Sequence, residues 1–281
     1  MLNKNVLIFG SGAIGSHLGF CLSSAGLNVD FIARGKHFEK MKKSGLTIKI
    51  YDNKKIIKEK KIQEQDNVRF YSDLNQIKKN RNYDFIFLMN KINTVKNKEI
   101  KRISKFIKKN TSIIPQCTQI PFWLNPEIYR TKKIIKNKDI NFIYNKFLPK
   151  NKIIGMSAWV SAKIEKPGMI HVKHIQRGYP LKEIYKNNEK SCIFLRNQIK
   201  KFCVSPKVKN IDAEIYIKST NALAFNLVAL NTLKNNKKLY ECEDSKKKIF
   251  EIMSEGDEYL KRKKIRIPQS IKNRIKQTLS S

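Results

Sequence analysis

The chain has 281 residues, 41% of them hydrophobic, and a formal net charge of +36 at pH 7. This length allows one large domain or two smaller ones, and the composition is typical of a globular protein rather than a disordered one. No apolar run approaches the roughly 18 residues of a membrane span, and the first residues lack the features of a signal peptide, so we expect a cytoplasmic protein with no membrane partner.

The positive charge alone does not predict a nucleic-acid partner. The basic residues are overwhelmingly lysine, with only about ten arginines, whereas base and phosphate recognition favours the arginine fork. They are spread over the whole chain together with many isoleucines and asparagines, as drift toward A/T-rich codons would produce. We therefore expect no specific nucleic-acid partner, only salt-sensitive association with polyanions.

Cysteines and histidines give no sign of a metal or disulfide framework. The five cysteines are scattered, odd in number and without a C-x-x-C pair, and the four histidines lack metal-ligand spacing. This pattern indicates reduced thiols and no metal site.

The stretch NVLIFGSGAIGSHLGFCLSSAGLNVDFIAR, residues 5–34, is the most specific part of the sequence. An apolar strand is expected at Val6 to Phe9, then an amphipathic helix that Gly26 ends, then a second strand over residues 29–33. A G-x-G-x-x-G pattern separates the first strand from the helix. This arrangement predicts the βαβ unit of a Rossmann-type dinucleotide-binding fold. A glycine-rich turn in some other α/β protein is the alternative.

Each glycine of the pattern has an expected role. Gly10 allows the tight turn, Gly12 lets the backbone approach a pyrophosphate, and Gly15 lets helix and strand pack closely. The helix N-terminus offers unpaired N–H groups and a positive dipole to the phosphates. The expected cofactor-binding residues of the turn are Gly10, Ser11, Gly12, Ala13, Ile14 and Gly15.

The end of the second strand indicates which dinucleotide binds. An NAD enzyme usually places Asp or Glu there to hold the ribose 2′-hydroxyl. This chain instead has Ala33 and Arg34, followed by Lys36 and His37. Because arginine is rare in the chain and a cationic end suits a 2′-phosphate, we predict NADPH.

Further strands follow. Residues 85–89 form an apolar strand, with Lys91 just beyond its carboxyl end, where open α/β sheets bind ligands. Another short apolar strand is expected in TSIIPQCTQIPFW, residues 111–123, which ends in a proline-containing loop with Trp123. The lysine-rich residues 51–65 are expected to form a solvated hairpin or loop.

The pattern changes after about residue 153. Alternating residues predict antiparallel strands joined by a turn at Pro167–Gly168. A helix is expected over residues 191–203, a short strand over residues 206–211, and helices from Asp212 onward.

We therefore predict an α/β protein of two domains. Residues 1–209 would form the Rossmann-type NADPH-binding domain, and residues 210–281 a smaller all-α domain for substrate binding or dimerisation.

The segment IYIKSTNALAFNLVAL, residues 215–230, predicts a buried helix that nevertheless contains Lys218. Helical spacing places Asn221, Ala222 and Asn226 on the same side as this lysine. Burying an ammonium costs several kcal/mol unless it has a partner, which implies a ligand or an anion. A lysine that extends from a partly exposed helix into solvent is the alternative.

With these pieces in order, the chain resembles the ketopantoate reductase (2-dehydropantoate 2-reductase) family over almost its whole length. The resemblance is carried by FGSGAIGSHLGFCLSSAG, FIAR, FLMNK, EKPGMIHVKH, YPLKEI and YIKSTNALAFNLVAL. It implies that Lys91 joins the glycine turn and Arg34 in holding NADPH. It also implies that Lys218 is the catalytic acid, protonating the ketone oxygen of a small 2-oxo acid while NADPH supplies hydride.

The resemblance also implies substrate residues, with three departures. Asn226 matches the second of two family asparagines, but the first position holds Ala222, with Asn221 one residue earlier. Where the family carries Asn-Gly after a strand, this chain has Thr118 and Gln119, and Thr118 is expected to contact the cofactor. A family Ser-Met-x-x-Asp segment would begin near Ser281, the third expected substrate residue, so we expect a helical domain shorter than that of the family.

Three hypotheses follow. The first is NADPH-dependent reduction of 2-dehydropantoate to pantoate, in pantothenate biosynthesis. The second is a degenerate relative that binds NADPH with little or different activity. The third is a basic nucleic-acid-binding or scaffolding protein on a reused Rossmann fold. A shortened helical domain would expose apolar surface and favour a homodimer.

Overall fold

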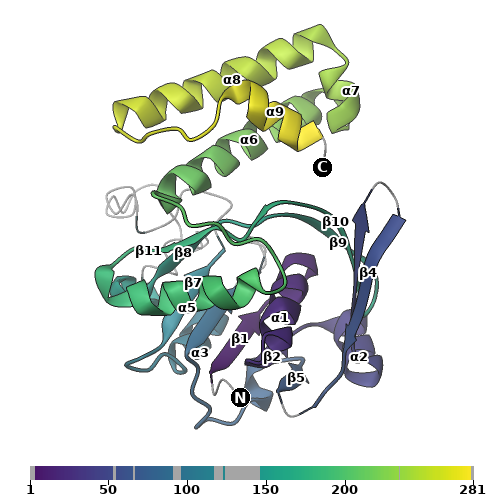
Figure 1. The fold of residues 1–281 in the computed structure, drawn as a ribbon, viewed down its shortest axis with the longest axis vertical. Coiled ribbons are helices and arrows are strands. Elements are labelled where there is room, and N and C mark those ends of the chain that lie inside the picture. Colours follow the sequence, from purple (N-terminus) through teal and green to yellow (C-terminus); the bar gives the residue numbers. More distant parts are fainter. Residues whose placement is uncertain are drawn as a thin grey trace. The chain divides into compact units, whose positions relative to one another are not determined.

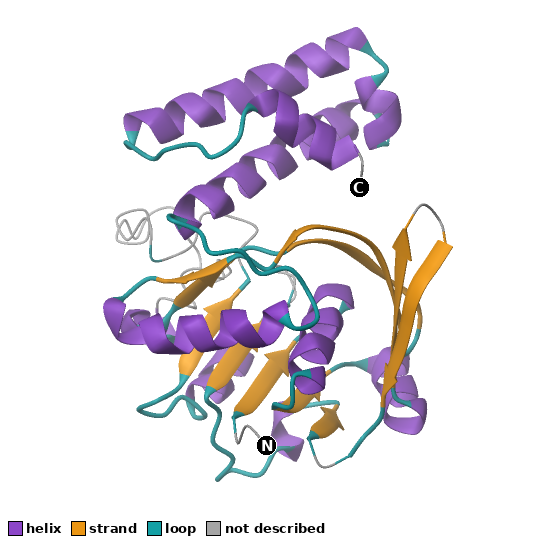
Figure 2. Ribbon diagram, viewed as in Figure 1, coloured by secondary structure: helices purple, strands orange, loops and turns teal. Residues whose placement is uncertain are grey.

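The computed structural model describes residues 4–52, 55–65, 67–90, 96–116, 123, 146–233 and 235–279 (Figures 1 and 2). The chain separates into two compact units. The first contains Met1–Gln116 and Pro121–Lys209, and the second contains Asn210–Ser281.

A five-stranded parallel sheet forms the centre of the first unit. Its strands are β1 (Asn5–Phe9), β2 (Asn28–Ile32), β5 (Val68–Tyr71), β6 (Phe85–Leu88) and β7 (Ser112–Pro115), in the order β5-β2-β1-β6-β7. All four neighbouring pairs are parallel. The strand order reverses between β1 and β6, and the crevice at such a reversal is where open α/β sheets bind ligands. The expected Rossmann-type architecture is confirmed.

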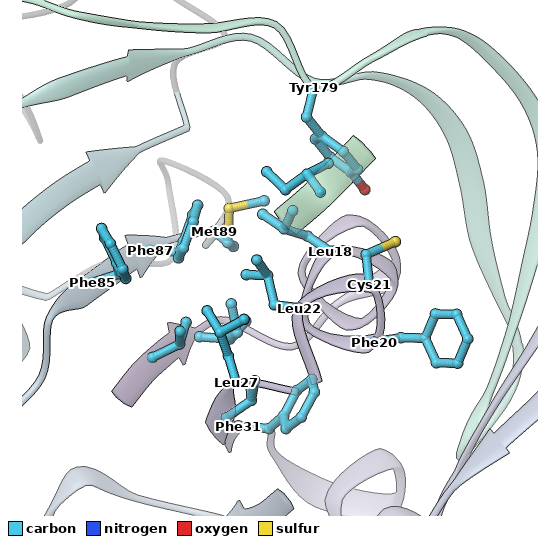
Figure 3. Close-up of a cluster of buried hydrophobic side chains, with 14 of the residues drawn as sticks. Leu18, Phe20, Cys21, Leu22, Leu27, Phe31, Phe85, Phe87, Met89 and Tyr179 are labelled. Atoms are coloured by element: carbon cyan, nitrogen blue, oxygen red, sulfur yellow. The ribbon is translucent and has the colours of Figure 1, made fainter. Parts of the chain in front are cut away.

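Helices cover both faces of this sheet. Successive side chains of β1 point to opposite sides, and because they are apolar on both sides, each face is buried against helices. Val6 and Ile8 share a buried cluster with side chains of α1 (Ala13–Ser24) and α5 (Glu189–Lys200), while Leu7 and Phe9 pack with α3 (Asn97–Ser104). The 3-10 helix η1 (Leu74–Gln76) also packs on the second face. Figure 3 shows Leu18 and Leu22 of α1 on the side of the helix toward Phe87 and Met89.

A second sheet, of order β4-β3-β10-β9, joins segments far apart in sequence. Its strands are β3 (Leu46–Asp52), β4 (Lys55–Ile62), β9 (Trp159–Lys166) and β10 (Met169–Gly178). The predicted hairpin around Pro167–Gly168 is confirmed as the antiparallel pair β9–β10. The lysine-rich segment pairs as the β3–β4 hairpin, and β4 is exposed along most of its length.

The smaller elements complete the first unit. Helix α2 (Gly35–Ser44) follows β2 directly, and the short strands β8 (Ile154–Met156) and β11 (Leu181–Glu183) form an antiparallel pair. The 3-10 helices η3 (Lys150–Lys152) and η4 (Lys186–Asn188) lie in the connections.

The short strand predicted over residues 206–211 is wrong. Residues 206–210 form a loop, and Ile211 is the first residue of α6 (Ile211–Thr232). The side chain of Asn210 accepts hydrogen bonds from the backbone N–H groups of Asp212 and Ala213, at 2.9 and 3.2 Å. This cap starts the helix, so the local apolar pattern did not decide the conformation.

The second unit is helical, with α7 (Asn236–Tyr240), α8 (Glu243–Arg262) and α9 (Ile271–Leu279) following α6. Its core includes Phe225 and Val228 of α6 together with Ile249 and Met253 of α8. None of the helices in the described part of the chain is both long and apolar enough to cross a membrane.

Candidate functional site

The glycine turn connects β1 to α1. Gly10 has φ +106°, a conformation that side-chain-bearing residues rarely adopt. Gly12 is the N-cap residue of α1, and a Cβ on Gly15 would collide with the Gly10 carbonyl oxygen. The turn is held in place by the backbone N–H of Ser11, which donates to the Ile32 carbonyl at 2.8 Å. The first N–H groups of α1 have no acceptor within the helix, so they can bind a ligand placed at this turn.

A pocket of about 280 Å³ lies at this turn. Its walls come from the carboxyl ends of β1, β2 and β6 and from α2 and β9: they are formed by Gly10, Ser11, Gly12, Ile32, Ala33, Arg34, His37, Met89, Asn90 and Ile164. The pocket thus sits at the reversal of strand order. Its size fits part of a dinucleotide rather than a whole one.

Three polar atoms at this pocket are buried without a hydrogen-bond partner among the described residues. They are Oγ of Ser11, Oδ1 of Asn90 and Nε2 of His37. Ser11 is only 3% exposed. Buried polar groups are normally hydrogen-bonded, so unpaired atoms gathered at one pocket indicate a polar ligand. The Ser11 hydroxyl and the open backbone at Gly12, where a Cβ would meet nothing within 4 Å, fit the phosphates of a dinucleotide. Asn90 Oδ1 is an acceptor and fits a ligand hydroxyl instead.

The cationic end of β2 faces an acid. Arg34 is the residue before α2, its side chain is 50% exposed, and its guanidinium forms an ion pair with Glu99 of α3. Glu99 is only 12% exposed. Its other carboxylate oxygen accepts a hydrogen bond from the backbone N–H of Lys96 at 2.9 Å. The predicted phosphate-binding arginine therefore already has an anionic partner.

His37 connects the pocket to the β9–β10 turn. The backbone N–H of Gly168 donates to Nδ1 of His37 at 3.0 Å. Burial lowers the pKa of His37 below its ordinary value. The imidazole is therefore neutral near pH 7, and Nδ1 as acceptor leaves the proton on Nε2.

In the helical unit, Lys218 lies on α6, half-buried, and burial lowers the pKa of its ammonium to about 8. A buried environment disfavours the charged amine, which makes the ammonium a stronger acid than an ordinary lysine. An ammonium group with this pKa is suited to donating a proton near neutral pH.

The two asparagines of α6 have different surroundings. Asn221 is 6% exposed, and both polar atoms of its carboxamide lack hydrogen-bond partners among the described residues. Asn226 is exposed, and Ala222 is half-buried. A buried, unpaired carboxamide is costly, so Asn221 is the better candidate for a ligand contact.

Three predicted site residues, Lys91, Thr118 and Ser281, lie outside the described residues. Two residues of interest at the site were not expected from the sequence, Asn90 and Glu99. Asn90 had a sequence signal, since it is the first polar residue after the apolar strand 85–89. Glu99 had none, because its partner Arg34 is 65 positions away.

Comparisons with known proteins support this description. Residues 6–116 match the profile of the family described as "Ketopantoate reductase PanE/ApbA". No curated protein matches the sequence significantly. The family match confirms the resemblance to ketopantoate reductases, a family of oxidoreductases, over residues 6–116.

The structure is also similar to solved structures across nearly the whole chain. One is a D-mandelate dehydrogenase in a ternary structure with NADH and anilino(oxo)acetate: identity is 20%, 99% of this chain and 79% of that chain are covered, and the TM-score is 0.75. Another is 2-dehydropantoate 2-reductase from Porphyromonas gingivalis, with 15% identity, 99% and 88% coverage and a TM-score of 0.71. A PanE/ApbA family ketopantoate reductase from Ralstonia eutropha has 17% identity, 98% and 80% coverage and a TM-score of 0.68. At these identities the likeness shows a shared fold.

Proposed function

We propose that this chain, which carries the sequence profile of the ketopantoate reductase family over residues 6–116, is an NADPH-dependent reductase of a small 2-oxo acid. The expected reaction is 2-dehydropantoate to pantoate. The observation that carries the proposal is the pocket at the end of β1, where unpaired polar atoms of Ser11 and Asn90 adjoin the open backbone of the glycine turn. When bound, NADPH supplies hydride to the carbonyl carbon.

Residues of the first unit would bind the cofactor. The start of α1 and Ser11 Oγ would hold the pyrophosphate, because N–H and O–H donors at a helix N-terminus complement its charge. Arg34 would contact the 2′-phosphate, since β2 ends without the acid that NAD proteins place there. Lys91 and Thr118 are expected to add contacts.

Lys218 would act as the general acid. Its ammonium would donate a hydrogen bond to the ketone oxygen and transfer a proton as negative charge develops there, a contribution of about 10²–10⁴-fold in rate. The pKa of about 8 supports this role. Asn221, with its unpaired carboxamide, would orient the substrate beside Lys218, and Asn226 and Ser281 are further candidates from the family pattern.

A second candidate function is supported by the sequence of α6. Ala222 occupies the position where the family carries the first asparagine after the lysine, and a methyl group cannot replace a carboxamide's donor and acceptor. A chain with this change could bind NADPH yet act slowly on 2-dehydropantoate, or prefer another 2-oxo acid.

The test is to follow NADPH absorbance with purified protein and a panel of 2-oxo acids that includes 2-dehydropantoate. We expect turnover with 2-dehydropantoate that is lost in Lys218→Met, while NADPH binding is kept. NADPH binding with no turnover of 2-dehydropantoate would favour the second candidate. Protein that does not bind NADPH would contradict both.

A further inference from the structure

The two partners of the ion pair at the end of β2 differ in how firmly they are held and how exposed they are. Glu99 is the fixed partner: it is 12% exposed, one of its oxygens accepts from the Lys96 backbone N–H, and the other contacts Arg34. Arg34 is the freer partner, 50% exposed, on the rim of the pocket. The contact uses the single terminal nitrogen Nη2 of Arg34. Since a guanidinium presents five N–H donors along its edges, the same arginine can hold a second anion.

This arrangement changes the expected cofactor selectivity. A 2′-phosphate carries up to about two negative charges at neutral pH, as other phosphate monoesters do. If Arg34 bound it, Glu99 would share the same guanidinium and repel it. A ribose 2′-hydroxyl is neutral, and a nearby carboxylate is the usual acceptor for it in NAD-binding proteins.

We propose that Glu99 is a specificity-determining residue that weakens the discrimination between NADPH and NADH, so that the protein accepts both cofactors. The inference rests on the proposed function, because it concerns the adenosine end of the same site. NAD-binding proteins carry an acid at the end of β2. Here the acid at this place is Glu99 of α3, which is held there by its ion pair with Arg34. Arg34 favours the 2′-phosphate, and Glu99 offsets part of that preference.

A purely structural ion pair is the competing explanation. Exposed pairs stabilise proteins by only about 0–1 kcal/mol and are often incidental. Glu99 differs from such pairs because it is mostly buried and both of its oxygens are engaged. Its partner also lines the pocket, so the charge of Glu99 acts where a ligand would bind.

The deciding variant is Glu99→Gln. Glutamine keeps an oxygen that can accept from the Lys96 N–H at the start of α3, so the helix cap is retained while the charge is removed. Dissociation constants for NADPH and NADH would be measured by calorimetric titration of the full chain. We expect NADPH to bind about three- to tenfold more tightly, an order of magnitude set by screened charge repulsion, and NADH to bind no more tightly than before.

The matched control is Glu243→Gln, which removes an exposed acid paired with Lys246 on α8. It should leave the ratio of the two dissociation constants unchanged. An unchanged ratio in Glu99→Gln would overturn the inference, as would an equal change for both cofactors, which is what a structural role would give. If the unsubstituted chain bound neither cofactor, the proposed function itself would fail, a result distinct from an unchanged ratio.

Discussion

At the scale of single residues, two glycines of the turn have different roles: one is needed for the backbone conformation, and the other leaves space for a ligand. Gly10 is required by the fold, because its φ is +106° and a Cβ would lie 2.7 Å from the backbone nitrogen of Asn90 and overlap its carboxamide. Gly12 is not, because a Cβ there meets nothing within 4 Å. The open space at Gly12 is therefore available to a ligand.

Alanine substitutions at these two glycines should behave differently. Gly10→Ala should destabilise the protein by about 2–4 kcal/mol through strain and overlap. Gly12→Ala should change the free energy of unfolding by less than about 0.5 kcal/mol, yet weaken NADPH binding about tenfold or more because the methyl group blocks the backbone from the pyrophosphate. Urea unfolding and NADPH titration of both variants check this. Normal NADPH affinity in Gly12→Ala would refute the assignment.

Lys218 predicts a pH dependence. Burial lowers its pKa to about 8, so the ammonium is present below that pH and is lost above it. In the proposed mechanism the ammonium is the proton donor for ketone reduction, so we predict that kcat falls as pH rises through about 8. Oxidation of the hydroxy acid needs the neutral amine, so its rate should rise over the same range. The measurement is kcat against pH in both directions.

Lys218→Met is the control for that profile. It should lower kcat by about 10²–10⁴-fold and remove the step near pH 8. A profile that stayed unchanged in the variant would assign the titration to another group.

The sequence was sufficient for residues with local signals and insufficient for those without. The glycines, Arg34 and Lys218 could be named as candidates because each lies at a fixed position relative to a strand or on a helix face, and their roles stay predictions. Glu99 could not, because what matters is its ion pair with Arg34, which only the tertiary structure brings together. The buried state of Asn221 likewise depends on packing that residue spacing does not report.

At the scale of elements, β1, β2, β6 and β7 could be predicted because they are buried and mostly apolar. Strand β5 was not expected, because its four residues include Arg69 and alternate between buried and half-buried. In the second sheet the β9–β10 hairpin could be predicted, but its joining to β3 could not, since β3 pairs in parallel with β10 more than a hundred residues later. The error at residues 206–211 has two causes. A short apolar alternation forms a strand only where a neighbouring strand pairs with it, and the Asn210 cap makes Ile211 the first residue of a helix.

Helices α6 and α8 supply a test of packing in the second unit. A Cβ on Gly256 of α8 would overlap the Thr220 methyl group, and the Thr220 hydroxyl, which donates to the Tyr216 carbonyl at 3.0 Å, fixes that rotamer. Gly256→Ala should therefore destabilise the protein by about 1–3 kcal/mol, although alanine favours helices by about 1 kcal/mol over glycine.

The double variant Gly256→Ala with Thr220→Ala checks the cause. Removing the threonine methyl should make Gly256→Ala less destabilising than it is alone, as measured by thermal unfolding. Equal destabilisation in both backgrounds would mean that the two helices do not meet there.

At the scale of the whole molecule, cations outnumber acids by more than two to one, 59 against 23. Most lysines therefore cannot pair with an acid, and their mutual repulsion opposes the compact state. Raising the salt concentration from about 0.01 to about 0.15 M shortens the screening length from about 30 to about 8 Å. The unfolding temperature should rise with salt over this range, and a fall would show that ion pairs outweigh repulsion.

The central claim is that hydride passes from a nicotinamide cofactor to the carbonyl carbon of a 2-oxo acid in this protein. Its most direct test is incubation with 2-dehydropantoate and NADPH deuterated at the transferable C4 position, followed by mass spectrometry of the hydroxy acid. We predict product carrying one deuterium on the former carbonyl carbon, formed about 10²–10⁴-fold more slowly with Lys218→Met. Hydroxy acid formed without deuterium from either C4-deuterated form of NADPH would contradict the account.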